Sequence, residues 1–355
     1  MNLYFAPLEG IGGYIYRNAQ ADFFPKADRY FSPFLSPRTG KRLTPKEYRD
    51  IAPEHNENIH LVPQIMTNRA ESFIRTANEL KILGYEEVNL NLGCPSRTVV
   101  TKGRGAGFLA YPEKLDQFLY DVFDKTDMAV SVKTRIGMED AEEFMRLLEI
   151  FNRYPIAELI IHPRLQTDYY KNHPNMEMFA YALGHTNLPV VYNGDLFSVS
   201  DVQRFAERYP AARTVMMGRG VLCDPSLFGK IRAGLSEPFL TEREIGDRQN
   251  LLEQMDGKKT DSNVYFWGNN DERVITKERL RDFHDRLLSD YAEVLSGEKP
   301  LLYKMKEIWF YMAHIFTDYS KYEKKIRKSM RLTDYRAVVN SLFAEQELRM
   351  SDFEG

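Results

Sequence analysis

Cysteine is scarce in this sequence, since only Cys94 and Cys223 occur among 355 residues. Two thiols cannot form a framework of disulfide bonds, and the sequence has no CxxC or HExxH motif with which to hold zinc. The composition therefore excludes a disulfide-rich secreted scaffold and zinc sites of these types. We expect a protein of a reducing compartment, the cytoplasm.

Long apolar runs and a strong net charge are also missing. No segment reaches the roughly 18 consecutive apolar residues of a transmembrane helix, and the N-terminus lacks the basic and apolar regions of a signal peptide. The formal net charge of -3 argues against a uniformly basic nucleic-acid binder, but a local basic run extends from Lys321 to Arg331. With 43% hydrophobic and 28% charged residues, the chain is expected to be globular and to have no membrane partner.

Short apolar runs alternate with longer helical patterns through about residue 232. This alternation is typical of βα units in a parallel sheet, and runs rich in Val and Ile fit strands that are covered on both faces. Eight such units favour a closed (β/α)8 TIM barrel of the α/β class over an open sheet. The predicted strands are residues 3–7, 29–32, 61–65, 87–92, 129–134, 158–162, 189–192 and 214–217.

The pattern changes beyond the predicted barrel. Residues 280–295, 301–316 and 335–348 read as amphipathic helices, so a C-terminal helical domain is expected to follow. Residues 246–274 are polar and rich in turn formers, and both a small hairpin and disorder stay open for them. We therefore divide the chain into a catalytic barrel (1–232), a linker or insertion (233–275) and a helical domain (276–355).

Glycine-rich loops follow the last two predicted strands. TIM-barrel enzymes place their sites on the loops after the strands, often with a phosphate site after strands seven and eight. Here those loops carry Asn193-Gly194-Asp195 and Gly218-Arg219. Glycine lets the backbone approach a phosphate, and arginine donates a bidentate pair of hydrogen bonds. Either motif alone is compatible with a simple tight turn, but together they favour a phosphorylated cofactor.

Other strand ends add polar side chains to the same mouth, by which we mean the end of the barrel where the strands finish. These are Gln64, Lys133, Arg135, His162 and Arg164. A lysine, a glutamine and a histidine around a phosphate-anchored cofactor suit a flavin, because a fixed cation stabilises the reduced anionic ring. Each residue alone is also compatible with a structural role. We assign Arg135 and Arg164 to the substrate.

Neither EGIGG nor GRGAG forms a competing dinucleotide-binding fingerprint. GRGAG lacks the required spacing, and EGIGG lacks the acidic partner.

Cys94 follows the fourth predicted strand in the stretch NLNLGCPS, so we expect it at the mouth. Nothing in the local sequence supplies the partner that lowers the pKa of a nucleophilic thiol. A thiol with an ordinary pKa of about 8.5 stays mostly protonated at neutral pH and can donate its proton, which favours an acid, while the role of a small buried structural residue stays open. Cys223 is predicted to be structural, as buried free cysteines usually are.

Several motifs, in order along the chain, resemble those of the tRNA-dihydrouridine synthases. They are APLEGIGGYIYR, PQI at Gln64, NLNLGCPSRTVVTKGRGAGFL, VKTRIG, IHPR, YNGD and MGRGVLCDP. The resemblance covers residues 1–232 and extends more loosely into the helical tail. It implies a barrel that binds FMN, NADPH as the reductant, and a helical domain that helps to hold tRNA.

The resemblance also implies roles for individual residues. Cys94 is expected to protonate C5 of uracil while reduced flavin passes a hydride to C6 from the opposite face, and Asn91 is expected to contact the base. The uridine must leave its stack, because a base inside folded RNA cannot reach the mouth. The implied flavin contacts are Pro7, Gln64, Lys133, His162, Asn193, Gly194, Asp195, Gly218 and Arg219.

The basic run is the candidate surface for tRNA phosphates. Lys324, Lys325 and Lys328 are the residues to which we assign this contact, although a solvated helix face has the same pattern. The target uridine and the preference for NADPH over NADH do not follow from the sequence. A monomer is expected.

Three other functions stay open on the sequence alone. An oxidoreductase acting on a small pyrimidine would use the barrel but leave the helical tail without a role. A flavin- and folate-dependent RNA methyltransferase would use the same scaffold, with Cys94 attacking the base. A catalytically silent RNA-binding protein is disfavoured by the intact Cys94 and the complete set of flavin residues.

Overall fold

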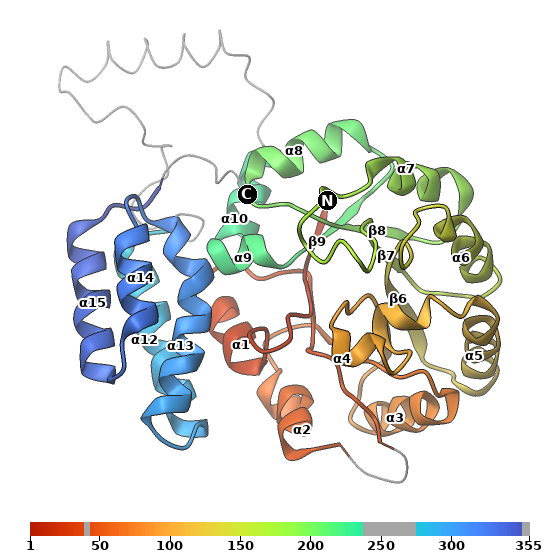
Figure 1. The fold of residues 1–355 in the computed structure, drawn as a ribbon, viewed down its shortest axis with the longest axis horizontal. Coiled ribbons are helices and arrows are strands. Elements are labelled where there is room, and N and C mark those ends of the chain that lie inside the picture. The colour runs from red at the N-terminus through yellow and green to blue at the C-terminus, as the bar shows by residue number, and fades with distance from the viewer. Residues whose placement is uncertain (39–42, 237–274, 350–355) are drawn as a thin grey trace, which may run out of the picture.

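The computed structural model describes residues 1–38, 43–236 and 275–349. In this part of the chain a TIM barrel is followed by a group of C-terminal helices, as the sequence predicts (Figure 1). Residues 246–274, which the sequence analysis left open, lie outside the described residues. None of the described helices combines the length and the apolar character needed to cross a membrane.

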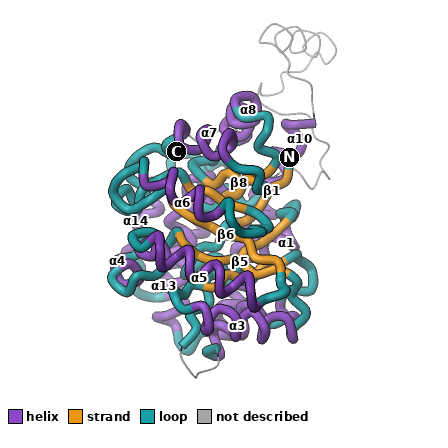
Figure 2. The backbone as a smooth tube through the Cα atoms, turned by 90° about the vertical axis from the view of Figure 1, so that its right-hand side faces the viewer, coloured by secondary structure: helices purple, strands orange, loops and turns teal. Residues whose placement is uncertain are grey.

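All strand pairs of the described sheet are parallel, and the spatial order is β3-β2-β1-β9-β8-β7-β6-β5-β4. The strands lie in the middle of the barrel with helices around them (Figure 2). Their bounds are β1 (Asn2–Phe5), β2 (Arg29–Phe31), β3 (Leu61–Val62), β4 (Gln64–Ile65), β5 (Glu87–Leu92), β6 (Ala129–Arg135), β7 (Leu159–His162), β8 (Val190–Asn193) and β9 (Thr214–Met217).

Strands β3 and β4 are the two halves of one predicted strand. Pro63 separates them, because proline has no N–H to donate to a ladder. The first half pairs with β2 and the second half pairs with β5, so together they join the two ends of the sheet. The eight predicted runs therefore correspond to eight barrel positions, and the prediction of a closed barrel is confirmed.

Helices cover the outside of the barrel. The sequence TPKE begins one of them as expected: the Thr44 side chain accepts a hydrogen bond from the Glu47 N–H, and Glu47 accepts one from the Thr44 N–H. The helix bounds are α1 (Tyr14–Phe23), α2 (Pro45–Ile51), α3 (Ala70–Ile82), α4 (Arg97–Val100), α5 (Pro112–Lys125), α6 (Glu143–Phe151), α7 (Met176–His185), α8 (Val199–Arg208), α9 (Arg219–Cys223) and α10 (Leu227–Ser236). Short 3-10 turns η1 (Pro53–His55) and η2 (Gly105–Phe108) lie in two of the loops.

The barrel interior has an apolar layer. Its side chains alternate along the strands with those that pack under the outer helices, as expected for a barrel. The layer consists of Tyr4, Ala6, Phe31, Val62, Ile160, Val191 and Met216. Polar side chains occupy the levels on either side of it, near the strand starts and near the strand ends.

The C-terminal helices form their own core and pack on the barrel. Trp309 Nε1 donates to Tyr335 Oη at 2.6 Å, and the same hydroxyl hydrogen-bonds His284 Nε2 at 2.6 Å, which ties three helices together. Phe283 packs its ring against Tyr16 and Phe24 of the barrel. The helices are α12 (Lys277–Val294), α13 (Glu298–Met312), α14 (Ser320–Lys328) and α15 (Leu332–Glu345), with the 3-10 turn η3 (Ala313–Ile315) after α13.

Three of these four helices match the predicted amphipathic patterns, while α14 matches the basic run. The described part of the chain thus contains a barrel followed by helices, as expected. The exact division at residues 232 and 275 stays a prediction.

Candidate active site

Strand register brings the polar side chains of neighbouring strands together at the mouth. Asn91 of β5 lies opposite Lys133 of β6, and Arg135 of β6 lies opposite His162 of β7. Because side chains two apart in a strand face the same way, Lys133 and Arg135 share one face of the sheet. Four residues singled out in the sequence therefore meet in one place.

A chain of buried amides shapes the loop that carries Cys94. The Asn91 Oδ1 accepts hydrogen bonds from the N–H groups of Gly93 and Cys94, each at 3.0 Å. The Asn91 Nδ2 donates to Gln64 Oε1 at 2.6 Å, and Gln64 Nε2 donates to Asn89 Oδ1 at 2.8 Å. These bonds position the loop that carries the thiol. The side-chain amides of Asn91 and Gln64 each keep a second N–H that can donate to a ligand.

The GRGAG stretch packs directly against the cysteine loop. The Ala106 N–H donates to the Cys94 carbonyl at 3.1 Å, and Gly105 has a φ of +54°. A Cβ at position 105 would lie 2.9 Å from the Cys94 carbonyl oxygen, so only glycine fits this approach without a shift. Sequence reasoning set GRGAG aside as a cofactor motif and missed this supporting role, for which its glycines were the available signal.

The environment of Cys94 keeps its thiol protonated. The side chain is half-buried, and loss of water raises the pKa of the thiol, with the negative charge of Glu9 adding to the effect. A hydrogen bond to the Ser96 backbone and the cations Arg135 and Lys133 act in the opposite direction, but the net shift is upward. A raised pKa suits a proton donor and does not suit a thiolate nucleophile.

Lys133 is a half-buried lysine without an anionic partner among the described residues. Burial, together with the smaller effect of the nearby Arg135 guanidinium, lowers the pKa of its ammonium from 10.5 to about 7. Nothing in the described part of the chain makes a hydrogen bond or ion pair with it. A ligand that brings negative charge to this ammonium would restore its proton affinity, which is the behaviour expected of a cofactor contact.

Asp195 joins the loops after three strands. Arg164 donates to both of its carboxylate oxygens, at 2.9 and 2.5 Å, and Arg219 donates to Oδ1 at 2.5 Å. Arg164 also contacts His162 Nε2 at 3.1 Å. Burial and the surrounding cations hold the pKa of His162 well below its ordinary value, so its ring is neutral. A neutral imidazole at the mouth is available as a hydrogen-bond partner.

Arg135 is committed to the backbone of neighbouring loops. Its guanidinium donates to the carbonyls of Gly93, Leu165 and Tyr169 at 3.0, 2.6 and 2.7 Å, and its side chain is almost fully buried. Together with the Asp195 bonds of Arg164, these contacts show that both arginines shape the mouth. Their assignment to the substrate stays a prediction.

Tyr170 is a mouth residue that sequence reasoning missed. Its ring centroid lies 4.8 Å from the Arg219 guanidinium carbon and 6.0 Å from the His162 ring centroid, and 52% of the residue is exposed. The only signal was its position, eight residues beyond His162 in the loop IHPRLQTDYY. The sequence does not show the path of this loop, so it does not predict which of its residues lies near Arg219 and His162.

The remaining predicted flavin contacts also lie after strand ends. Pro7 follows β1 and is half-buried, while Asn193 ends β8 and donates to the Met216 carbonyl at 2.8 Å. A Cβ at Gly194 would lie 2.0 Å from Tyr192 Oη, so a side chain there requires the Tyr192 ring to move. Gly218 immediately precedes α9. Their contact with a flavin stays a prediction.

The three lysines assigned to tRNA phosphates, Lys324, Lys325 and Lys328, are exposed on α14. They belong to the C-terminal helices and not to the barrel mouth. The structure therefore divides the predicted site residues into a group at the mouth and a group on the C-terminal helices.

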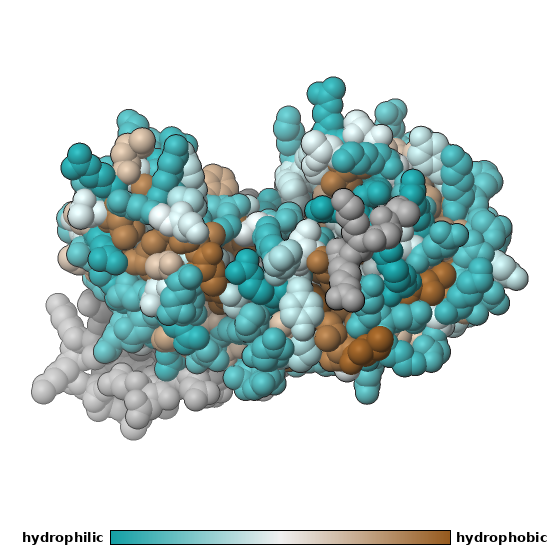
Figure 3. Space-filling model, turned by 90° about the horizontal axis from the view of Figure 1, so that it is seen from below, coloured by the Kyte–Doolittle hydropathy of each residue, from teal (hydrophilic) through white to brown (hydrophobic). Residues whose placement is uncertain are grey.

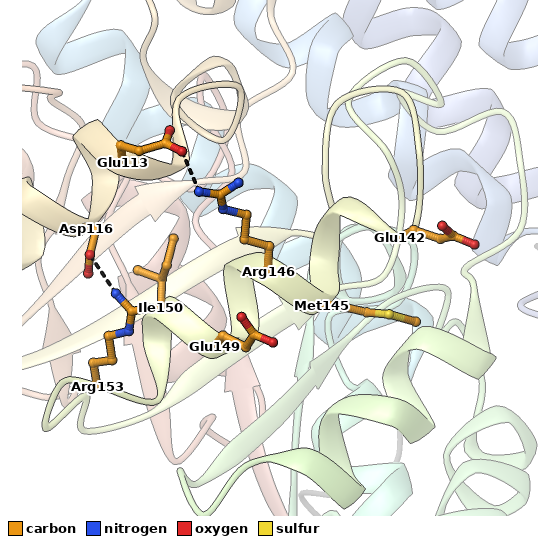
Figure 4. A pocket seen from close by; sticks show the side chains of 8 residues that line it. All are labelled: Glu113, Asp116, Glu142, Met145, Arg146, Glu149, Ile150 and Arg153. Carbon is orange, nitrogen blue, oxygen red and sulfur yellow. Dashed lines mark hydrogen bonds and ion pairs between the residues drawn. The ribbon is translucent and has the colours of Figure 1, made fainter.

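A shallow surface pocket between α5 and α6 lies apart from this site (Figure 4). Ion pairs cross it from Arg146 to Glu113 at 2.5 Å and from Arg153 to Asp116 at 2.8 Å. None of the predicted site residues lines it. Its lining consists of Glu113, Asp116, Glu142, Met145, Arg146, Glu149, Ile150 and Arg153.

Comparison with known proteins identifies the family of the chain. Residues 5–263 match the family model described as dihydrouridine synthase. A tRNA-dihydrouridine(16) synthase of Cupriavidus necator is 28% identical over 250 residues, which are 68% of this chain and 76% of that protein. The tRNA-dihydrouridine synthase B of Pasteurella multocida is 24% identical over 254 residues, which are 71% of this chain and 75% of that protein.

Among solved structures, a 2-naphthoyl-CoA reductase in complex with 2-naphthoyl-CoA is similar in fold. Its TM-score is 0.51 at 11% identity, and the match covers 66% of this chain and 50% of that one. This likeness supports the barrel architecture alone.

Proposed function

The chain belongs to the dihydrouridine synthase family, and from this we propose that it reduces the C5–C6 double bond of uridines in tRNA to 5,6-dihydrouridine. The relatives named above act on tRNA according to their names. The observation that carries the proposal is a protonated thiol, Cys94, beside a half-buried, unpaired lysine, Lys133, at the barrel mouth.

The donor set at the mouth fits FMN. The unpaired Lys133 ammonium, the neutral His162 and the remaining N–H of Gln64 suit the polar edge of the ring, and Arg219 suits the phosphate. FMN held by these residues and reduced by NADPH would supply a hydride for C6 of uracil. Pro7, Asn193, Gly194, Asp195 and Gly218 complete the proposed cofactor surface.

Cys94 delivers the proton that the reaction needs at C5. The bond between the thiol hydrogen and sulfur breaks while a C–H bond forms, and the thiolate that remains is stabilised by Lys133 and Arg135, whose charges lower its pKa. Asn91 holds the loop in place and keeps one N–H free for the base. Arg135 and Arg164 contribute to substrate binding by fixing the loops around it.

The raised pKa of Cys94 also distinguishes between the candidate reactions. A methyltransferase that attacks the base through this residue needs a thiolate, which burial and Glu9 disfavour. A pyrimidine oxidoreductase without RNA would leave the exposed lysines of α14 without a ligand. We propose that Lys324, Lys325 and Lys328 bind tRNA phosphates, that the protein acts as a monomer, and that it works in the cytoplasm, where tRNA is available.

Mass-spectrometric mapping of tRNA tests the proposal. Unmodified transcript incubated with the purified protein, FMN and NADPH is expected to gain about two mass units at specific uridines, because reduction adds two hydrogens. A gain of about fourteen units would show methylation instead. Reduction of free uracil at a rate equal to that of tRNA would favour the small-molecule alternative.

A further inference from the structure

Helix α13 exposes large apolar side chains on the face that points away from its core. Tyr303 and Phe310 are 59% and 55% exposed, and they lie seven residues apart, so they share one side of the helix. Met330, just beyond α14, is 79% exposed. We call Tyr303, Lys306, Phe310 and Met330 the α13 stripe.

The stripe lies between the barrel mouth and the basic helix. On one side of α13, Lys304 Nζ donates to the carbonyl of Gly10 in the loop after β1 at 2.6 Å, and Tyr311 lies within the electrostatic reach of Arg219. On the other side, Lys306 Nζ donates to the carbonyl of Ser329, the residue that precedes Met330. Seen from below, the helical part and the barrel form two lobes with a notch between them (Figure 3).

Basic side chains accompany the exposed rings. The ammonium groups of Lys299 and Lys306 lie 5.9 and 5.8 Å from the Tyr303 ring centroid. The acidic Glu307 on the same face is paired with Lys304 at 2.7 Å, so its charge is compensated. Exposed aromatic rings interleaved with lysines, next to further lysines on α14, match the chemistry of surfaces that bind single-stranded nucleic acid.

We propose that the α13 stripe stacks on unpaired bases of the tRNA whose uridine enters the mouth. This inference rests on the proposed function. A uridine that leaves its stack exposes the faces of its neighbours, and aromatic side chains replace the lost stacking whatever the base. The adjoining lysines favour a polyanion over an apolar protein partner, since each of them would lose water in an apolar interface.

Binding of unmodified tRNA transcript to the full-length protein, without NADPH so that no reduction occurs, tests the stripe. Phe310→Ala and Tyr303→Ala are each expected to weaken binding roughly 5- to 140-fold, which corresponds to the loss of one stacked base. The slope of log affinity against log salt should stay unchanged, because no phosphate contact is removed. Tyr120→Ala on α5, where Tyr120 is also 59% exposed, is the matched control and should bind as the wild type does.

Two further variants separate stacking from general apolar contact. Phe310→Trp should keep the affinity and lose indole fluorescence when tRNA binds, whereas Phe310→Leu should bind as weakly as Phe310→Ala. Equal affinity of the leucine variant and the wild type would overturn stacking. A concentration-dependent dimer of the wild type that Phe310→Ala abolishes would assign the stripe to a second copy of the chain instead.

The failure of this inference differs from the failure of the proposed function. If the wild type forms dihydrouridine but Phe310→Ala binds tRNA with unchanged affinity, the stripe has no role in binding and the reaction stands. If the wild type forms no dihydrouridine but Phe310→Ala still loses tRNA affinity, the stacking surface stands and the reaction does not.

Discussion

The two ends of the barrel both contain charged side chains, but they balance charge differently. Where the strands start, Arg29 pairs with Glu87 at 2.9 Å and Glu158 at 3.2 Å, and Tyr4 Oη donates to Glu158 at 2.8 Å. At the mouth, Arg164 and Arg219 pair with the same carboxylate, Asp195. Carboxylates outnumber cationic side chains where the strands start, and cationic side chains outnumber carboxylates at the mouth.

Hydrogen bonding and charge balance are separate requirements at the mouth. Arg135 donates three of its five N–H groups to backbone carbonyls, which carry no net charge and so do not neutralise its own. Loss of water lowers the pKa of Lys133, and the neighbouring Arg135 charge adds to this effect. A structural ion cluster needs no ligand, whereas a surplus of buried cations favours the binding of an anion. We therefore expect the ion cluster at the strand starts to stabilise the barrel and the cations at the mouth to bind the cofactor.

The largest effect is expected for Cys94→Ala. Loss of a positioned acid should slow the reduction of tRNA uridines by about 10² to 10⁴, while anaerobic bleaching of the bound flavin by NADPH keeps a near-normal rate, because that step needs no proton at C5. Stopped-flow absorbance separates the two half-reactions.

Cys94→Ser should restore little activity, since a hydroxyl is a far weaker acid than a thiol. If Cys94→Ala reduces uridines at the wild-type rate, Cys94 is not the donor. If only the NADPH half-reaction fails, the cysteine loop shapes the flavin pocket instead.

The next largest effect is expected for Lys133→Met, which should weaken FMN binding by about 1.5 to 3 kcal/mol if the ammonium bonds a charged or polarised group. Because the pKa of free Lys133 is about 7, FMN affinity of the wild type should fall as pH rises above that value. The variant should lose this dependence, which titration of flavin fluorescence at several pH values measures.

The lowered pKa of Lys133 also predicts how the free energy of unfolding changes with pH. Between pH 7 and 10.5 the unfolded chain holds a proton at Lys133 that the cofactor-free fold has released, so this group makes stability rise with pH in that window. Lys133→Met should lower the slope of unfolding free energy against pH. An unchanged slope would contradict the lowered pKa.

Arg219→Ala should weaken FMN binding by about 1.5 kcal/mol, the lower limit for a hydrogen bond to a charged group, because Arg219 is shared with Asp195. Asp195 keeps its two bonds to Arg164, so the mouth should stay folded. Isothermal titration with FMN measures the difference. Arg153→Ala, which removes the same charge from the surface just beyond α6, is the control, and equal affinities of the two variants would refute the role of Arg219.

Arg29→Met tests the opposite end of the barrel. Loss of the cation that Glu87 and Glu158 share should reduce stability by about 1 kcal/mol, a modest value because the Arg29 side chain is 28% exposed. Burial raises the pKa of Glu158, so the loss should shrink at acidic pH, where this carboxyl is neutral. Urea unfolding at two pH values measures this. If Arg29→Met changed the affinity for FMN and left the free energy of unfolding unchanged, the structural role of this end of the barrel would be contradicted.

The smallest effect per residue is expected on α14, where the positive surface continues beyond the barrel. Neutralisation of each of Lys324, Lys325 and Lys328 should reduce the magnitude of the salt slope of tRNA binding by roughly 0.7 to 0.9. Filter binding at several salt concentrations measures this slope. Neutralisation of Lys81, Lys114 and Lys125 on the barrel surface is the control. Unchanged affinity and slope in the α14 variant would show a merely solvated face.

Much of the fold is readable from local pattern. The eight strands, the capping residues of α2 and the amphipathic C-terminal helices follow from periodicity and from neighbouring residues. Motifs at strand ends must meet at one mouth once the barrel closes, so the position of Cys94, Lys133 and His162 is also predictable. The division of β3 from β4 is a small departure that Pro63 explains.

The sequence by itself determined the barrel and which residue types reach the mouth, because the periodic pattern marks each strand and the residues at its end. Only the tertiary structure decided which partners the polar groups take: Arg135 with distant carbonyls, Gly105 against Cys94, and Tyr170 over Arg219. It also decided the protonation of Cys94 and Lys133, since a pKa follows from burial and from charges far away in the sequence. Contacts between residues far apart in the sequence produce no periodic pattern, so they cannot be predicted from neighbouring residues.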